Sequence, residues 1–324
     1  MSTAASPEGS LSSASPQRWS VLYVGGMPRS GSTLFDLMVG QLPDHCDVGE
    51  LFYLWQAGPL RNQLCACGHV FSDCPFWTAV GTRAFGGWST LDIPDVLALQ
   101  RRVDSTLRLA LAGVADLLPK HSDDVERYLK LTRTLYAAIA TTASARVVVD
   151  STKRPSTAYL LAADKGIDLA VAHIVRDPRA VVNSWNHQVP LPDKAASHSY
   201  MPRRSQRQTT RRWVTVNFMF ERLRAKGVPT ARIRYEDLVR DPAHAMTRVL
   251  SLWSQVPGRG DLDFLTPDGL RTGTSHAVAG GRVRLSSGVL PLRLDESWRR
   301  ELAPWRAQLT RASTWPLMRR YGYR

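Results

Sequence analysis

The residues from Val21 to Thr33, VLYVGGMPRSGST, join an apolar run to a turn rich in glycine and hydroxyl side chains. Successive backbone N–H groups in such a turn, followed by the N-terminus of a helix, bind phosphate-like anions. A nucleoside-triphosphate loop carries a lysine directly after its second glycine. Here Ser32 stands at that position, and Arg29 is the cation of the loop. The pattern predicts an anion-binding loop in which Ser30, Ser32 and Thr33 donate hydroxyls to a ligand that needs no metal ion.

Basic and hydroxyl residues also follow two other apolar runs. Lys153 and Arg154 come directly after the run 145–151, and Arg176 stands at the end of the next run. Ser184 lies eight residues after Arg176, which is about two turns of a helix, so both side chains can face one anion. These positions predict two separate phosphate sites, one at each strand end.

Four short, apolar, β-branched runs are typical of buried parallel strands. They cover residues 19–26, 145–151, 169–177 and 231–238. Segments with apolar residues at three- and four-residue steps predict the helices between them. These segments cover residues 32–42, 94–119 and 123–143. The alternation predicts an α/β protein with a P-loop-NTPase-like three-layer fold, in which helices flank a central, mostly parallel sheet. Ligands of such sheets bind at the carboxyl ends of the strands.

The composition is that of a globular protein, because 44% of the 324 residues are hydrophobic. Residues 1–18 are biased toward Ser, Ala, Pro and Gly, which predicts a disordered tail before a single domain at 19–324. No apolar run is long enough to span a bilayer and no secretory signal is present, so we expect a cytoplasmic protein. The net charge of +14 favours an anionic partner. The segment 186–212 contains five arginines and is either a solvated basic loop or a lid over an anionic ligand or an acidic acceptor.

Four ordered segments resemble the bacterial and Golgi-type sulfotransferases, and their layout is closest to that of the protein-tyrosine sulfotransferases. The segments are GMPRSGST, VDSTK, VRDPRAVVNSW and RYEDLVRDP. The resemblance implies transfer of a sulfuryl group from 3′-phosphoadenosine 5′-phosphosulfate (PAPS) to a hydroxyl acceptor, which leaves 3′-phosphoadenosine 5′-phosphate (PAP). It also implies that the loop Arg29–Thr33, including Gly31, grips the 5′-phosphosulfate, and that Arg176 and Ser184 hold the 3′-phosphate. No metal ion is required in this scheme.

Glu50, in HCDVGELFYLW, is the favoured general base. It follows the loop by one helix and a turn, and the resemblance places a catalytic glutamate in a Gly-Glu pair here. Arg29 and Lys153 are expected to stabilise the charge on the leaving phosphate. Two alternatives stay open, because Glu50 could merely cap the next helix, and His276 or His45 could take its role.

The segment SHAVAGGRVR resembles the family pattern His-x-x-x-Gly-Asn-x-x-Arg. Arg284 matches the arginine and becomes a candidate ligand of the 3′-phosphate. Gly281 replaces the asparagine, which leaves the geometry of this loop open. Without the resemblance, the segment is a flexible glycine- and serine-rich loop.

Three of the four cysteines lie within LCACGHVFSDCPFW. Cys65, Cys67 and Cys74 could bind zinc together with His69 or Cys46. The spacing is unlike that of the usual zinc knuckles, so we expect no metal site. Reduced cysteines packed beside neighbouring aromatic residues, or one local disulfide, are the alternatives.

Three functional hypotheses follow. The first is a PAPS-dependent sulfotransferase that acts on a small-molecule or peptide hydroxyl, with neither nucleic acid nor membrane as a partner. The second is a P-loop small-molecule kinase, which should need Mg²⁺ and the loop lysine that this chain lacks. The third is a non-catalytic, basic nucleic-acid-binding protein, whose affinity should fall steeply with salt. An alcohol or phenol of a metabolite, a glycan hydroxyl and a peptide tyrosine all fit the first hypothesis.

Overall fold

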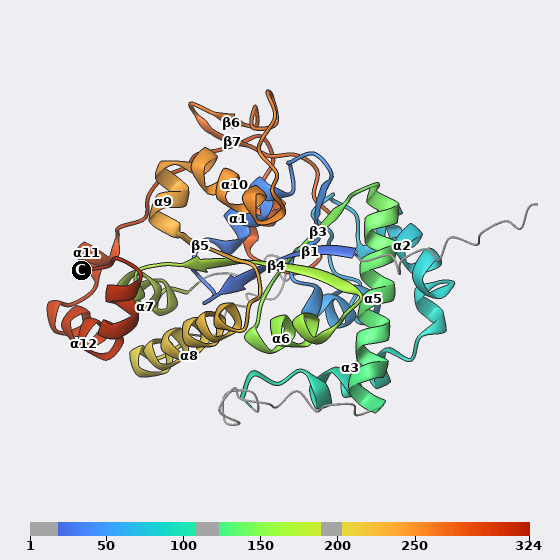
Figure 1. Cartoon of the computed structure of the whole chain (residues 1–324), viewed down its shortest axis with the longest axis horizontal. Coiled ribbons are helices and arrows are strands. Elements are labelled where there is room, and N and C mark those ends of the chain that lie inside the picture. Colours follow the sequence, from blue (N-terminus) through green and yellow to red (C-terminus); the bar gives the residue numbers. More distant parts are fainter. Residues whose placement is uncertain (1–18, 108–122, 189–202) are drawn as a thin grey trace, which may run out of the picture.

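A five-stranded parallel sheet forms the centre of the protein in a computed structural model that describes residues 19–107, 123–188 and 203–324 (Figure 1). The strands lie in the order β2-β3-β1-β4-β5. Their bounds are β1 Trp19–Gly26, β2 His45–Asp47, β3 Val147–Lys153, β4 Ile167–Val175 and β5 Thr230–Arg234. Helices cover both faces, so the predicted three-layer α/β fold is confirmed. The expected tail at 1–18, and residues 189–202 of the basic segment 186–212, lie outside the described residues.

The two faces of the sheet carry separate apolar cores because side chains alternate along each strand. Leu22 and Val24 of β1 pack on one face, against three helices. Val21 and Tyr23 pack on the other, with the remaining helices of the sheet. The first group of helices is α1 Ser32–Val39, α9 Tyr235–Arg240 and α10 Pro242–Leu250. The second group includes α5 Asp123–Ala143, α6 Pro155–Ala163, α8 Gln206–Ala225 and α12 Pro304–Arg320.

The remaining elements lie around this frame (Figure 1). The helices are α2 Pro75–Phe85, α3 Ile93–Val103, α7 Pro178–Asn186 and α11 Trp298–Glu301. A small antiparallel sheet consists of β6 Leu265–Thr266, β7 Gly269–Arg271 and β8 Val289–Leu290. From β1 the chain continues toward the β2 edge, and from β4 toward the β5 edge. The carboxyl ends of these two neighbouring strands therefore flank a topological switch point, where open α/β sheets bind ligands.

Two segments differ from the sequence-based expectation. The helix predicted over 94–119 ends at Val103, and its second half lies outside the described residues. Asp104 leaves the helix because its buried carboxylate accepts hydrogen bonds from the hydroxyls of Ser156 and Thr157 on α6. The last apolar run, predicted as a strand over 231–238, is a strand only to Arg234 and then turns into α9. The three-residue strand β2 was not predicted.

Candidate active site

The predicted anion-binding loop connects β1 to α1. Arg29 has φ +77° and Gly31 has φ +88°, so the chain turns twice through the left-handed region before the helix begins at Ser32. A Cβ at Gly31 would lie 2.5 Å from the ring of Tyr235, which closes the loop from the side of α9. The Ser30 hydroxyl is buried and has no hydrogen-bond partner in the part of the chain that the structure describes. A buried donor without a partner is costly, and a bound anion would satisfy it.

Glu50 and Lys153 form a close ion pair. The Lys153 ammonium lies 2.7 Å from Oε1 of Glu50, and the side chains are only 7% and 17% exposed. Lys153 ends β3 with φ +68° and also donates to the carbonyl of Ser151 at 2.8 Å. Glu50 precedes the single helical turn Leu51–Tyr53, but its side chain makes no capping hydrogen bond. The Glu50 carboxylate is therefore paired with Lys153 and does not cap the helical turn.

The loop around Gly281 joins this pair to the anion-binding loop. The N–H of Glu50 donates to the carbonyl of Ala279 at 3.3 Å. A Cβ at Gly280 would lie 3.7 Å from Oε1 of Glu50, and a Cβ at Gly281 would lie 2.9 Å from Oγ1 of Thr33. Two consecutive glycines thus leave room beside the two halves of the site, where a larger side chain would meet Glu50 or Thr33. An asparagine at 281, as in the family pattern, would require Thr33 to shift.

Arg176, at the carboxyl end of β4, holds the other side of the loop. Its guanidinium donates to the carbonyl of Arg29 at 3.1 Å and to the carboxylate of Asp295 at 2.8 Å. It also lies over the ring of Tyr235, 4.3 Å from its centroid. Partial burial works against the charge of Asp295, but hydrogen bonds from Ser297 and Arg176 lower the pKa of this carboxyl to about 2. Asp295 therefore gives Arg176 an anionic partner in this structure.

Positive charge collects around Trp185 on α7. The guanidinium of Arg29 lies 5.4 Å from the Trp185 ring centroid, and that of Arg204 lies 4.8 Å from it. Burial lowers the pKa of Arg29. Burial also lowers the pKa of Arg212, and the nearby charges of Arg204 and Arg154 lower it further. The arginines near Trp185 give a positive potential beside the loop, which attracts an anionic ligand. Arg204 and Arg212 come from the basic segment 186–212.

Ser184 and Arg284, the other two residues predicted to bind the 3′-phosphate, lie in different surroundings. Ser184 lies on α7, one residue before Trp185, and is partly exposed. Arg284 is 3% exposed, and its guanidinium donates to the carbonyls of Leu64 and Val278, both at 3.1 Å. Through these hydrogen bonds Arg284 connects the segment before the glycine loop to the loop of residues 64–74.

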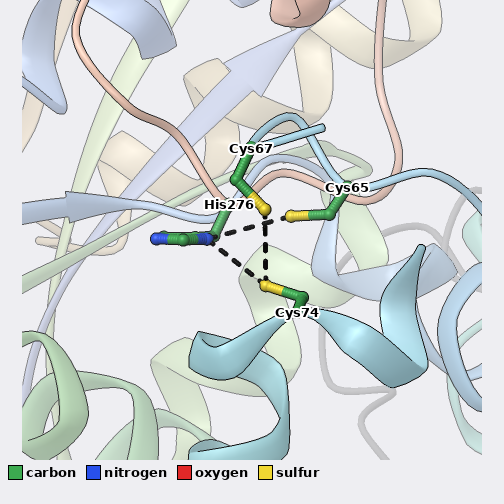
Figure 2. A group of neighbouring side chains, drawn as sticks. All are labelled: Cys65, Cys67, Cys74 and His276. Atoms are coloured by element: carbon green, nitrogen blue, oxygen red, sulfur yellow. Dashed lines mark hydrogen bonds between the residues drawn. The ribbon is translucent and has the colours of Figure 1, made fainter. Parts of the chain in front are cut away.

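His45 and His276, the alternatives to Glu50 as general base, have other contacts. Nδ1 of His45, in β2, contacts the carbonyl of Pro43 at 2.7 Å. His276 stacks on Phe76, with ring centroids 4.4 Å apart, and its Nδ1 faces Cys65 and Cys74 (Figure 2). His173 is buried within β4.

Asp295, Tyr235 and Trp185 were not assigned to the site from the sequence. Tyr235 is the second residue of RYEDLVRDP, and Trp185 ends VRDPRAVVNSW, so both lie within the segments that resemble the sulfotransferases. Asp295 carries no such signal, because it reaches Arg176 from 119 residues away.

A phosphate-type loop and a largely buried carboxylate–ammonium pair lie at the carboxyl edge of the parallel sheet, together with several arginines. Residues 22–253 match the model of the sulfotransferase family. This match covers well over half of the chain, so the protein belongs to the sulfotransferase family and is a transferase of sulfuryl groups. The family assignment favours the first hypothesis over the kinase and the nucleic-acid-binding protein.

Several solved structures are similar to the chain. The sulfotransferase domain from the olefin synthase of Synechococcus PCC 7002 has a TM-score of 0.44 and 19% identity, over 96% of this chain and 97% of that one. The sulfotransferase domain from the curacin biosynthetic pathway has a TM-score of 0.47 and 17% identity, over 95% and 99%. Sulfotransferase STF9 from Mycobacterium avium has a TM-score of 0.48 and 13% identity, over 96% and 78%. No curated protein sequence matches the chain significantly.

The helices within 19–107, 123–188 and 203–324 are all too short or too polar to cross a membrane.

Proposed function

We propose that the protein transfers the sulfuryl group of PAPS to a hydroxyl of a small-molecule or peptide acceptor. The observation that carries the proposal is the Glu50–Lys153 pair, held at 2.7 Å beside the anion-binding loop. The residues present fit the donor, because the buried Ser30 hydroxyl has no partner among the described residues and the arginines near Trp185 give a positive potential. PAPS supplies a sulfuryl group that is activated by its anhydride bond to phosphate.

Glu50 acts as the general base in this proposal. Lys153 holds Oε1, and no described residue hydrogen-bonds the other oxygen, Oε2, which is left to accept the proton of the acceptor hydroxyl. The acceptor oxygen then forms its bond to sulfur while the bond from sulfur to the phosphate oxygen breaks. The salt bridge fixes the direction of the carboxylate before the acceptor arrives, so little reorganisation is needed.

Lys153 and the loop stabilise the leaving group. When the bond between sulfur and the 5′-phosphate oxygen breaks, negative charge develops on that oxygen of PAP. A cation that is already in place stabilises this charge. Lys153 is buried and donates to the Ser151 carbonyl, and its ammonium would donate to an oxygen of the leaving phosphate. Arg29 and the N–H groups before α1 supply the remaining positive potential.

Labelled PAPS with a panel of alcohols, phenols, glycans and tyrosine peptides tests the proposal. Transfer of label to at least one hydroxyl acceptor is expected, together with a PAP-dependent rise in the melting temperature. Donor binding measured by calorimetry should be equal with and without added Mg²⁺, since no metal ion takes part. ATP-dependent, Mg²⁺-requiring labelling of the same panel would contradict the proposal and restore the kinase hypothesis.

A further inference from the structure

Four potential metal ligands lie close together, and none of them belongs to the proposed sulfuryl-transfer site (Figure 2). They are Cys65, Cys67, Cys74 and His276, and their ligand atoms all lie within 4.8 Å of one another. Cys65 and Cys74 are fully buried, and all four cysteines of the chain are free thiols. Three thiols and an imidazole in one small volume form a ligand set that is typical of structural zinc.

Three of the six distances between ligand atoms are close to the edges of one tetrahedron. Bonds of about 2.3 Å to sulfur and about 2.0–2.1 Å to nitrogen place sulfur atoms about 3.8 Å apart and sulfur about 3.6 Å from nitrogen. The Cys67 and Cys74 sulfurs are 3.6 Å apart. The His276 Nδ1 lies 3.5 Å from the sulfur of Cys74 and 3.9 Å from that of Cys65. A metal ion could therefore enter with only small side-chain movements.

The backbone holds the four ligands in these places. Cys65 accepts a hydrogen bond from the N–H of Gly68 at 3.0 Å, in a turn that Gly68 closes with φ +92°. The N–H of Ala66 donates to the carbonyl of Ala277 at 3.0 Å, which ties this turn to the segment that carries His276. The indole N–H of Trp77 donates to the carbonyl of His276 at 2.8 Å. Such surrounding contacts orient the ligands of metal sites.

The two other ligands considered from the sequence are less suitable. Cys46 lies in β2, where it pairs with Val148 of β3 as part of the central sheet. His69 contacts Cys67, with 3.7 Å between Nδ1 and the sulfur, but it is exposed and does not belong to the group of four. His276 is 202 residues from Cys74, so no local spacing could reveal it.

We propose that Cys65, Cys67, Cys74 and His276 bind one structural Zn²⁺ ion. Four protein ligands fill the tetrahedron and leave no position for water or substrate, which distinguishes a structural site from a catalytic one. Binding releases the three thiol protons to solvent, and the site then carries a net charge of about −1. Cys74 immediately precedes α2, whose N-terminus faces and stabilises this charge.

The zinc ion links the loop of residues 64–74 to the segment that leads into Gly280 and Gly281. Ala279 in this segment accepts a hydrogen bond from the N–H of Glu50 at 3.3 Å, so the metal fixes one wall of the proposed sulfuryl-transfer site without touching the substrates. The zinc proposal does not depend on the proposed donor or acceptor. A zinc site and the transfer activity can thus fail separately.

Elemental analysis of the full-length protein, purified without a metal-affinity tag and washed with EDTA, tests the proposal. About one zinc per chain is expected. Cobalt introduced during growth should replace the zinc and give the thiolate-to-metal charge-transfer band and the visible bands of tetrahedral cobalt. A mercurial reagent that titrates thiols should release the zinc in proportion, as followed with a colorimetric chelator.

Substitutions separate ligands from neighbours. Cys74→Ser and His276→Ala should lower the zinc content to below about one fifth of the wild-type value. The matched controls Cys46→Ser and His69→Ala should keep about one zinc per chain. The wild-type measurements stand even where a ligand variant does not fold.

Three outcomes would overturn the proposal. Less than about 0.1 zinc per wild-type chain, with no tetrahedral cobalt spectrum after reconstitution under reducing conditions, would show that the cluster binds no metal. A disulfide between two of these cysteines in freshly isolated protein would show that they form a covalent cross-link and do not bind zinc. Loss of zinc in His69→Ala but not in His276→Ala would show that the fourth ligand is wrong.

Discussion

At the scale of single residues, the proposed chemistry depends on a carboxylate that is held before the acceptor arrives. Glu50→Gln keeps the shape of the side chain but removes its basicity, so turnover should fall by about 10²- to 10⁴-fold while PAP affinity changes little. Single-turnover assays with labelled PAPS, calorimetry with PAP and a melting curve measure the three quantities. Glu126→Gln, in an exposed pair with Arg133 on α5, is the control. Wild-type turnover in Glu50→Gln would remove Glu50 from the mechanism.

Arg176 and Asp295 give a second prediction at this scale. Arg176→Ala should weaken PAP binding by about 2–4 kcal/mol, since a buried charge-assisted contact is lost. Asp295→Asn should tighten PAP binding by about twofold to fivefold, because a competing, partly exposed charge is removed from Arg176. Arg176→Ala should bind PAP and AMP with equal affinity, because AMP lacks the 3′-phosphate.

Calorimetry with PAP and AMP measures these affinities, and Asp124→Asn, in a surface pair with Arg102, controls for the lost charge. If Arg176→Ala prefers PAP over AMP as strongly as the wild type does, Arg176 does not hold the 3′-phosphate.

At the scale of elements, the turn between β1 and α1 depends on Gly31. Gly31→Ala should lower the free energy of unfolding by about 2–4 kcal/mol and weaken PAP binding, because the new methyl group meets Tyr235 in a left-handed backbone. Gly227→Ala has the same strain, with φ +92°, but a Cβ there meets nothing within 4 Å. It should lose only about 1–2 kcal/mol and bind PAP normally. Urea unfolding measures both variants, and equal losses would show that the contact with Tyr235 is unimportant.

The elements also show how far the sequence determines the structure. The buried strands β1, β3 and β4 could be predicted within two residues, because their apolar runs are decided locally. Asp104 ends α3 through hydroxyls 52 and 53 residues away, and no periodicity in the sequence reports that contact. The loop and Glu50 were identified from motifs that are continuous in the chain. Asp295 and the pairing of His276 with three cysteines arise only from the tertiary fold.

At the scale of the whole molecule, one buried histidine should make stability depend on pH. His173 is fully buried, and this burial lowers its pKa to about 4. The unfolded chain takes up the proton near pH 6.5, before the folded protein does, so this stability is complete above pH 6.5 and is lost as the pH falls toward 4. Between pH 7 and 5 the loss should be about 2 kcal/mol.

His173→Gln keeps a donor for Asn217, which lies 2.9 Å from Nε2. The difference in free energy of unfolding between wild type and this variant, measured in urea at several pH values, isolates the contribution of the histidine. This difference should shrink as the pH is lowered. A constant difference would show that His173 does not control the acid sensitivity.

The two edge strands of the central sheet affect the tendency of the protein to aggregate at high concentration. One edge strand, β2, is only three residues long, and the other, β5, carries the charged side chains of Arg232 and Arg234. Both arginines lie over tyrosine rings near the C terminus, at 4.9 and 4.5 Å from the ring centroids. A second chain adding a strand would meet too few free backbone groups on one side, and on the other the arginine side chains, which are ion-paired with Glu221, Glu236 and Asp237. The sheet is thereby protected against edge-to-edge aggregation.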